Sequence, residues 1–142
     1  EKTRLLTALT HFELPKLLEK SLYHSLSEHV RVHDTIRVVV GVASNPVGRD
    51  IAWDFVKDNW KEFDRRYGEG GFALMSLVSI TSRFTTQEKL DDVQQFFEVH
   101  PAPSALRTIE QSLERVKLNI EWLKQNSSGL SRWLGSYEQR RY

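Results

Sequence analysis

The stretch HDTIRVVVGVAS, residues 33–44, decides the fold class, because it fits either a buried strand or a buried helix. β-Branched residues dominate from Ile36 to Val42, and such residues favour strands. No other strand-like run exists in the chain to pair with this one, and an unpaired strand leaves its backbone polar groups unsatisfied. We therefore predict a buried helix here, with Asp34 near its start, and an all-α fold.

Apolar residues recur at helical spacing on both sides of this stretch. Upstream, leucines predict two short helices, around residues 5–9 and 14–22. Immediately downstream, NPVGRDIAWDFVKDNW (residues 45–60) predicts one long helix that continues to Gly68. We expect Asn45 to be its N-cap and Pro46 its first helical residue.

The C-terminal half predicts four more helices, over about residues 72–84, 85–97, 106–123 and 130–134. We expect Thr85 to cap the second of these, since Glu88 completes a capping box. Ser127–Gly129 is expected to interrupt the chain before the last helix. About eight helices joined by short connectors favour antiparallel pairs stacked as a HEAT- or armadillo-like solenoid, in one domain over residues 1–142.

Composition excludes several classes of function. The 142 residues carry 20 basic and 19 acidic side chains, a net charge of +1, so the sequence indicates no nucleic-acid partner. Cysteine is absent, which rules out disulfides and thiolate metal sites. The chain begins at Glu1 rather than Met, which suggests a piece of a longer protein with any targeting segment upstream. A sequon at Asn126 is compatible with a secretory protein.

The sequence contains no set of residues typical of catalysis. His24, His29 and His33 are close in sequence, but no carboxylate completes a ligand set and H-E-x-x-H is absent. GEGGF (residues 68–72) lacks the Gly-Lys-Ser/Thr of a phosphate-binding loop. We predict no catalytic residue and no metal site in this chain. We expect four acidic side chains on helix faces to be solvated: Asp50, Asp54, Asp91 and Asp92. We expect the tryptophans to be mostly core: Trp53, Trp60, Trp122 and Trp133.

Three segments together resemble a known family. They are VASNPVGRDIAWDFVKDNWKEFDRRYGEGGF (residues 42–72), RFTTQEKLDDVQQFFEVHPAP (83–103) and RTIEQSLERVKLNIEWLKQN (107–126). Their Asn-Pro-x-Gly-Arg, Ala-Trp-x-Phe, Asn-Trp and Asn-Ile-x-Trp-Leu motifs are similar to those in the helical C-terminal domain of zinc aminopeptidases of the aminopeptidase N type. The resemblance extends from about Val32 to Leu134 and more loosely over the first 30 residues.

This resemblance implies the later part of the C-terminal domain of a longer gluzincin aminopeptidase. That domain is noncatalytic; it closes over the catalytic cleft and helps to enclose peptide substrates. Zinc, held by H-E-x-x-H and a downstream Glu, belongs to an upstream catalytic domain, which is the expected partner. A homodimer stays open, and a membrane-anchored ectodomain or a secreted protein is favoured over a cytoplasmic one. The alternative is a free-standing helical-repeat interaction module without peptidase activity.

The resemblance also nominates residues that face substrate. In this family, the connection after the long helix and the next helix's first turn face the catalytic cavity. The corresponding candidates are Gly70, Gly71, Phe72, Met75 and Ser76. The alternative is that Phe72 is core and the glycines only form a turn. Ser44 and Met75 occupy positions where other members carry basic residues, which favours a neutral or broad specificity.

Overall fold

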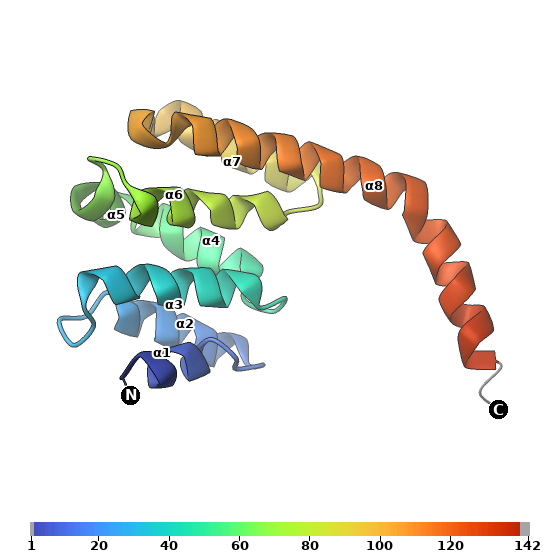
Figure 1. Cartoon of the computed structure of the whole chain (residues 1–142), viewed down its shortest axis with the longest axis horizontal. Coiled ribbons are helices and arrows are strands. Elements are labelled where there is room, and N and C mark those ends of the chain that lie inside the picture. The colour runs from blue at the N-terminus through green and yellow to red at the C-terminus, as the bar shows by residue number, and fades with distance from the viewer. Residues whose placement is uncertain (1, 140–142) are drawn as a thin grey trace.

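Helices form every regular element of the computed structural model between residues 2 and 139, the part of the chain that it describes (Figure 1). The predicted all-α fold class is therefore confirmed. The α-helices are α1 (Lys2–Leu9), α2 (Pro15–Ser25), α3 (Val32–Ser44), α4 (Arg49–Asp58), α5 (Trp60–Tyr67), α6 (Phe72–Ser79), α7 (Gln87–Val99) and α8 (Leu106–Gln139). Two short 3₁₀ helices, η1 (Ile80–Arg83) and η2 (Pro103–Ala105), precede α7 and α8.

The helices are stacked in layers, from α1 at one end to α7 and α8 at the other (Figure 1). α3 packs against α1, α2, α4 and α6 and so lies inside the stack. α8 packs against α6, η1 and α7 and covers the far end. This layered order is compatible with the predicted solenoid of helix pairs.

The β-branched segment is helical, as predicted. Val38, Val39 and Val42 of α3 are at most 1% exposed. An unpaired strand would leave their backbone groups without partners in this all-helical interior, whereas a helix satisfies them internally. Asp34 lies in the first turn of α3 and accepts a hydrogen bond from Arg31 Nε at 2.7 Å.

The long helix predicted from residue 46 is two helices, and its predicted cap is wrong. α4 begins at Arg49, after Gly48, and Asn59 separates it from α5. The Asn59 side chain donates to the Phe55 carbonyl at 2.8 Å. Such side-chain bonds compete with the helical backbone and favour a break.

Asn45 connects loops rather than capping α4. Its Nδ2 donates to the carbonyl oxygens of Thr10, at 3.0 Å, and Phe12, at 2.9 Å. Its Oδ1 accepts the Val47 N–H at 3.0 Å. The α3–α4 turn is thereby tied to the loop between α1 and α2.

The cap of α7 is also displaced from its predicted position. The Thr86 hydroxyl, not that of Thr85, accepts the Lys89 N–H, at 3.3 Å. The expected helix over residues 72–84 ends earlier, because α6 passes into η1 and the chain is extended at Phe84. Phe84 is buried. The backbone is extended at Phe84 and at Thr86, so the N-cap of α7 lies one residue later than predicted.

One acidic side chain that we expected to be solvated links two helices instead. Asp92 of α7 accepts hydrogen bonds from the Trp53 Nε1, at 2.7 Å, and from the Lys57 Nζ, at 2.9 Å. Lys57 also pairs with Asp54 at 3.1 Å. Because Trp53 is completely buried, Asp92 satisfies an indole N–H that water cannot reach.

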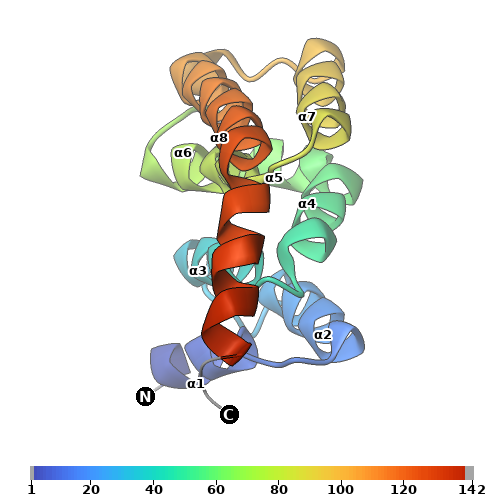
Figure 2. The same cartoon turned by 90° about the vertical axis from the view of Figure 1, so that its right-hand side faces the viewer.

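α8 runs without interruption through the predicted break at residues 127–129 (Figure 2). Two serines and a glycine weaken a helix only moderately, and no proline is present. Trp53 and Trp60 are core as predicted, but Trp122 and Trp133 on α8 are 56% and 59% exposed. Between residues 2 and 139 there are eight α-helices, as many as predicted, because one predicted helix is divided and two are merged.

Candidate functional site

The predicted substrate-facing residues lie at the turn between α5 and α6 and in the first turns of α6. Gly70 and Gly71 have φ angles of 110° and 97°, a backbone conformation that residues other than glycine rarely adopt. The turn is held to η2 by Ser104, whose hydroxyl donates to the Gly68 carbonyl at 3.0 Å. These glycines therefore form the sharp turn that the sequence predicts.

Phe72 is not a core residue, since 89% of its surface is exposed. Met75 is 39% exposed and Ser76 is half-buried. The steps of three and four residues between Phe72, Met75, Ser76 and Ser79 place them on one side of α6. The structure thus brings the predicted candidates together as one accessible stripe, although their contact with substrate stays a prediction.

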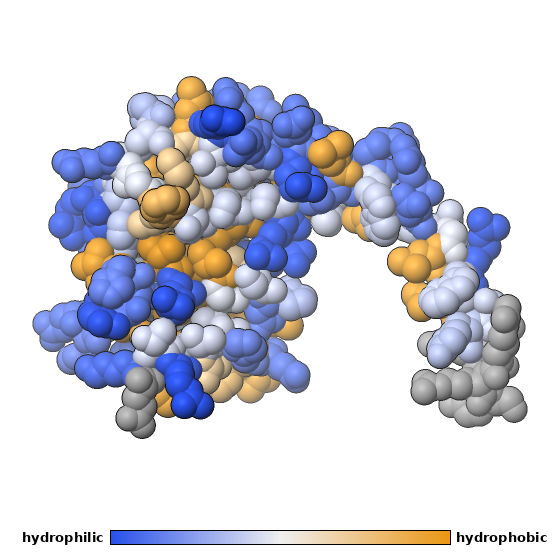
Figure 3. Space-filling view, in the orientation of Figure 1, coloured by the Kyte–Doolittle hydropathy of each residue, from blue (hydrophilic) through white to orange (hydrophobic). Residues whose placement is uncertain are grey.

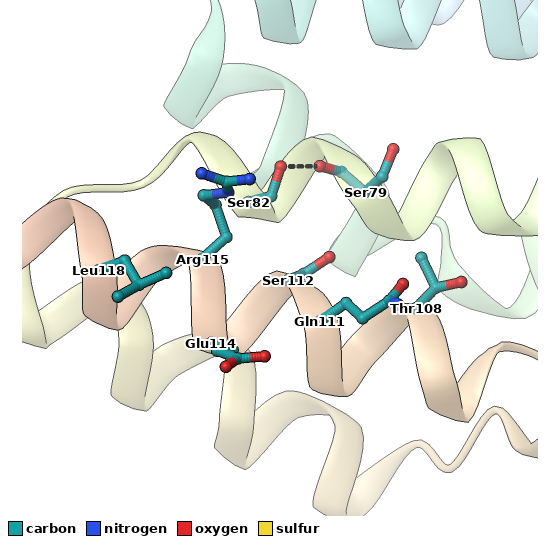
Figure 4. A pocket seen from close by; sticks show the side chains of 8 residues that line it. All are labelled: Ser79, Ser82, Thr108, Gln111, Ser112, Glu114, Arg115 and Leu118. Carbon is teal, nitrogen blue, oxygen red and sulfur yellow. Dashed lines mark hydrogen bonds between the residues drawn. The ribbon is translucent and has the colours of Figure 1, made fainter.

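A groove of about 470 Å³ continues this stripe between α6–η1 and α8 (Figure 4). Ser79 and Ser82 line one wall, and the Ser82 hydroxyl donates to the Ser79 carbonyl at 2.7 Å. The other wall is the face of α8 that carries Thr108, Gln111, Ser112, Glu114, Arg115 and Leu118. In Figure 4 the Arg115 side chain extends from α8 toward Ser82.

Asn119 fixes the two walls relative to each other. Its Nδ2 donates to the carbonyl oxygens of Ser82 and Phe84, each at 3.0 Å. The geometry repeats that of Asn45, which also bonds two carbonyls two residues apart. The groove is therefore a defined feature of the packed domain rather than a gap beside a loose helix.

The chemistry of the groove is that of a binding surface. Hydroxyl, amide, carboxylate and guanidinium groups line it, and these can bond peptide-like polar groups. No histidine lines it, so its hydroxyl groups have no neighbouring imidazole base. Nowhere in residues 2–139 do three His, Asp or Glu side chains converge as metal ligands would.

Sequence reasoning missed the wall that α8 contributes. The polar residues on it recur at helical spacing, but the same pattern is typical of a solvated helix face. Only the packing of α8 against α6 and η1, which are distant in sequence, makes those residues line a groove with Ser79. The α6 stripe, by contrast, could have been extended to Ser79 by its spacing alone.

The chain matches the family model described as "ERAP1-like C-terminal domain" over residues 1–118. It is 34% identical to aminopeptidase N of Rattus norvegicus over 94% of its length, and 33% identical to aminopeptidase N of Canis lupus familiaris over 98%. It is also 36% identical to the thyrotropin-releasing hormone-degrading ectoenzyme of Rattus norvegicus over 95%.

The same alignments cover only a small part of these relatives. The chain spans 14% of the rat aminopeptidase N, 15% of the dog protein and 13% of the rat ectoenzyme. The similarity therefore concerns one region of much longer proteins. None of the helices between residues 2 and 139 is long and apolar enough to cross a membrane.

Proposed function

The chain belongs to the aminopeptidase N-type family, as part of its C-terminal domain, and from this premise we propose its role in the whole enzyme. It is the noncatalytic domain of a zinc-dependent aminopeptidase that removes N-terminal residues from peptides. It closes over the cleft of an upstream catalytic domain in the same chain and helps to enclose the substrate. The zinc belongs to that upstream domain.

One observation carries this proposal: the exposed stripe of α6 leads directly into a polar groove. Phe72 and Met75 offer apolar contacts, and the groove offers hydroxyl and amide groups to a peptide backbone. Hydroxyl and amide groups can both donate and accept hydrogen bonds, as the N–H and C=O groups of a peptide backbone require. The rim therefore comprises Gly70, Gly71, Phe72, Met75 and Ser76, and the groove extends it.

The compartment we propose is extracellular, on a membrane-anchored or secreted enzyme. One relative is named as an ectoenzyme, and the chain carries a sequon at Asn126. Peptides with a free amino terminus are the proposed substrates.

The test is kinetic and uses the full-length enzyme with Met75→Arg. If Met75 faces the substrate cavity, a guanidinium there adds a charge-assisted contact to acidic amino-terminal residues. We expect kcat/KM for acidic relative to neutral substrates to rise by about tenfold. Stability should change by no more than about 0.5 kcal/mol, since the side chain is exposed.

Val99→Arg is the matched control, because Val99 is also an exposed apolar residue and does not line the groove. It should leave the substrate ratio unchanged. An unchanged ratio in folded Met75→Arg enzyme would exclude this rim from the substrate cavity. A longer sequence without H-E-x-x-H upstream would instead favour the interaction module.

A further inference from the structure

The last part of α8 lies outside the stack of helices and carries an exposed apolar stripe. We call residues 121–137 the distal arm; every residue from 121 to 135 is exposed. At 100° per residue, the large apolar and aromatic side chains of the arm fall within an arc of about 120°. These residues, all 37–59% exposed, are Trp122, Leu123, Leu130, Trp133, Leu134 and Tyr137. Figure 3 shows hydrophobic residues on the side of the arm that faces the open space beside the body.

One polar residue of the arm, Asn126, lies in the middle of this arc. It follows Trp122 by four residues and precedes Leu130 by four, a spacing that makes these side chains neighbours on a helix. Asn126 is exposed, and its Nδ2 donates a hydrogen bond to the Trp122 carbonyl at 2.8 Å. An apolar partner protein would bury this amide among apolar groups, which is costly unless further hydrogen bonds satisfy it. The stripe is therefore a poor fit for such a partner.

Asn126 is also the acceptor residue of the one glycosylation sequon in the sequence, Asn126-Ser127-Ser128. None of the other asparagines has a serine or threonine two positions later. Neither the residue inside the sequon nor the residue that follows it is proline. The only sequon thus lies at the centre of the exposed apolar stripe.

We propose that Asn126 carries an N-linked glycan whose first N-acetylglucosamine residues cover the apolar stripe of the distal arm. This inference rests on the extracellular compartment of the proposed function, since the sugar is transferred in the secretory pathway. In the transfer, Nδ2 forms a bond to C1 of the first sugar and loses a proton, while the C1–O bond to a polyprenyl pyrophosphate donor breaks and the pyrophosphate leaves. One N–H stays on Nδ2, so the bond to the Trp122 carbonyl can persist.

The helix geometry indicates that transfer precedes the completion of α8. Transfer requires the asparagine and the hydroxyl two residues later together, whereas residues two apart on an α-helix do not face each other. A helical segment of this length is marginal in water on its own, and Gly129 and Gly135 weaken it further. The sequon is therefore accessible in the newly made chain, and the glycan is in place when the helix forms.

A glycan fits the chemistry of the stripe because a sugar ring is amphipathic. Its C–H face packs on aromatic rings, while its hydroxyl groups stay in water. Trp122 and Trp133 are 56% and 59% exposed, and Trp133 stacks on Tyr137 with ring centroids 5.7 Å apart. These rings lie about one turn before and two to three turns after Asn126, within reach of the first sugars. Because a glycan is bulky and solubilising, it removes an exposed apolar patch from the surface.

Mass spectrometry of the full-length enzyme tests the modification. Trypsin cleaves after Lys124 and Arg132 and releases residues 125–132, which contain the whole sequon. We expect this peptide to carry a glycan, and peptide-N-glycosidase in heavy-oxygen water to convert its Asn126 to labelled aspartate. An unmodified peptide would overturn the proposal. Surface labelling and peptidase assays of the same protein report on the proposed function separately: an unmodified peptide from an active extracellular enzyme contradicts only the glycan.

A pair of serine variants tests whether the glycan covers the stripe. Ser128→Ala removes the sequon and keeps Asn126, whereas Ser127→Ala, the matched control, keeps the sequon. In hydroxyl-radical footprinting of the full-length enzyme, oxidation of Trp122 and Trp133 should rise about twofold in Ser128→Ala, since a sugar covers one of the two faces of an indole ring. It should stay at the wild-type level in Ser127→Ala. Equal oxidation in the two variants would show that no glycan covers the stripe.

Discussion

Gly48 is required for the space it leaves rather than for its backbone angles. Its φ of −92° is accessible to any residue. A Cβ added there would lie 2.5 Å from the Val42 carbonyl oxygen and 2.7 Å from the Val42 Cγ1. The glycine of the Asn-Pro-x-Gly-Arg motif thus permits the close approach of the α4 start to α3.

Gly48→Ala should therefore lower the free energy of unfolding by about 1–3 kcal/mol, because the backbone of α3 must shift. Gly129→Ala is the control, since apart from the neighbouring backbone of α8 no atom lies within 4 Å of the added Cβ. In the interior of α8 this change should be neutral or stabilising by up to about 1 kcal/mol. Chemical denaturation of both variants measures the difference; equal free energies would show that Gly48 is not sterically constrained.

Asn45 and Asn119 each connect two segments of the chain through side-chain hydrogen bonds, in two different layers of the stack. Each amide donates to two carbonyl oxygens: Asn45 to those of Thr10 and Phe12, and Asn119 to those of Ser82 in η1 and Phe84 just after it. The aspartate variants replace these donors by an acceptor that faces the carbonyl oxygens. We expect Asn119→Asp to destabilise the domain by about 1–3 kcal/mol at neutral pH, and more than Asn119→Ala does.

Because Asn45 and Asn119 contact different loops, the double variant should show additive losses within about 0.5 kcal/mol. Thermal and denaturant unfolding of the single and double variants measure this. A loss in Asn119→Asp smaller than that in the alanine variant would mean that the amide donors are not what holds α8 to the η1–α7 loop.

At the scale of elements, the contact between α4 and α7 depends on ionisation. Burial alone would raise the pKa of Asp92 from its ordinary value of 3.8, but hydrogen bonds from Lys57 and Trp53 outweigh it and lower the pKa. Burial would likewise lower the pKa of Lys57 from 10.5, yet its bonds to Asp92 and Asp54 raise it. Both shifts favour the charged pair.

The lowered pKa of Asp92 stabilises the fold above pH 3.8, and this stabilisation is lost as the pH falls through the folded-state value. The raised pKa of Lys57 stabilises the fold below pH 10.5, and this stabilisation is lost as the pH rises through the folded-state pKa. Asp92→Asn keeps an oxygen acceptor for the Trp53 N–H but removes the charge. The variant should therefore be less stable than the wild-type chain at pH 7, and the difference should shrink as the pH falls below 3.8; a constant difference would contradict this.

The helices themselves could be predicted from the sequence, but their ends and exposed faces could not. Periodicity places apolar residues on one face, which is why α2, α3 and α7 were expected near their observed positions. The division at Asn59 and the continuity of α8 through Gly129 depend on competing side-chain bonds and small helix penalties that periodicity does not measure. Trp122 and Trp133 fit a core pattern equally well, but within residues 2–139 no other helix buries them, whereas Trp53 is completely buried.

Part of the candidate site could likewise be predicted from the sequence, and part could not. Family motifs and the glycines pointed to the start of α6, and the structure finds a sharp turn followed by an accessible stripe there. The groove beside it depends on α6, η1 and α8 lying together, which is a property of the tertiary packing. Asp92 was misjudged for the same reason, because its partner Trp53 lies on another helix.

For the molecule as a whole, stability should be independent of the metal in the proposed parent enzyme. A catalytic zinc is held by three protein ligands, and no such set of His, Asp and Glu side chains converges within residues 2–139. A metal stabilises only the fold that binds it, by an amount that grows with its concentration relative to Kd. We therefore expect the interior of this domain, from α3 to α7, to gain no direct stabilisation from zinc.

We therefore expect removal of zinc from the full-length enzyme by a chelator to abolish peptidase activity and to speed amide exchange in the upstream catalytic domain. Exchange in residues 32–99, measured in the same digest, should change by less than about twofold, because these helices are held by apolar packing and by the Asp92 and Asn45 contacts. Met75→Arg enzyme provides a control, since it changes the rim but not the metal site. A large acceleration within α3–α7 on chelation would show that the domain's own stability is coupled to zinc and would contradict the proposal that the domain is metal-independent.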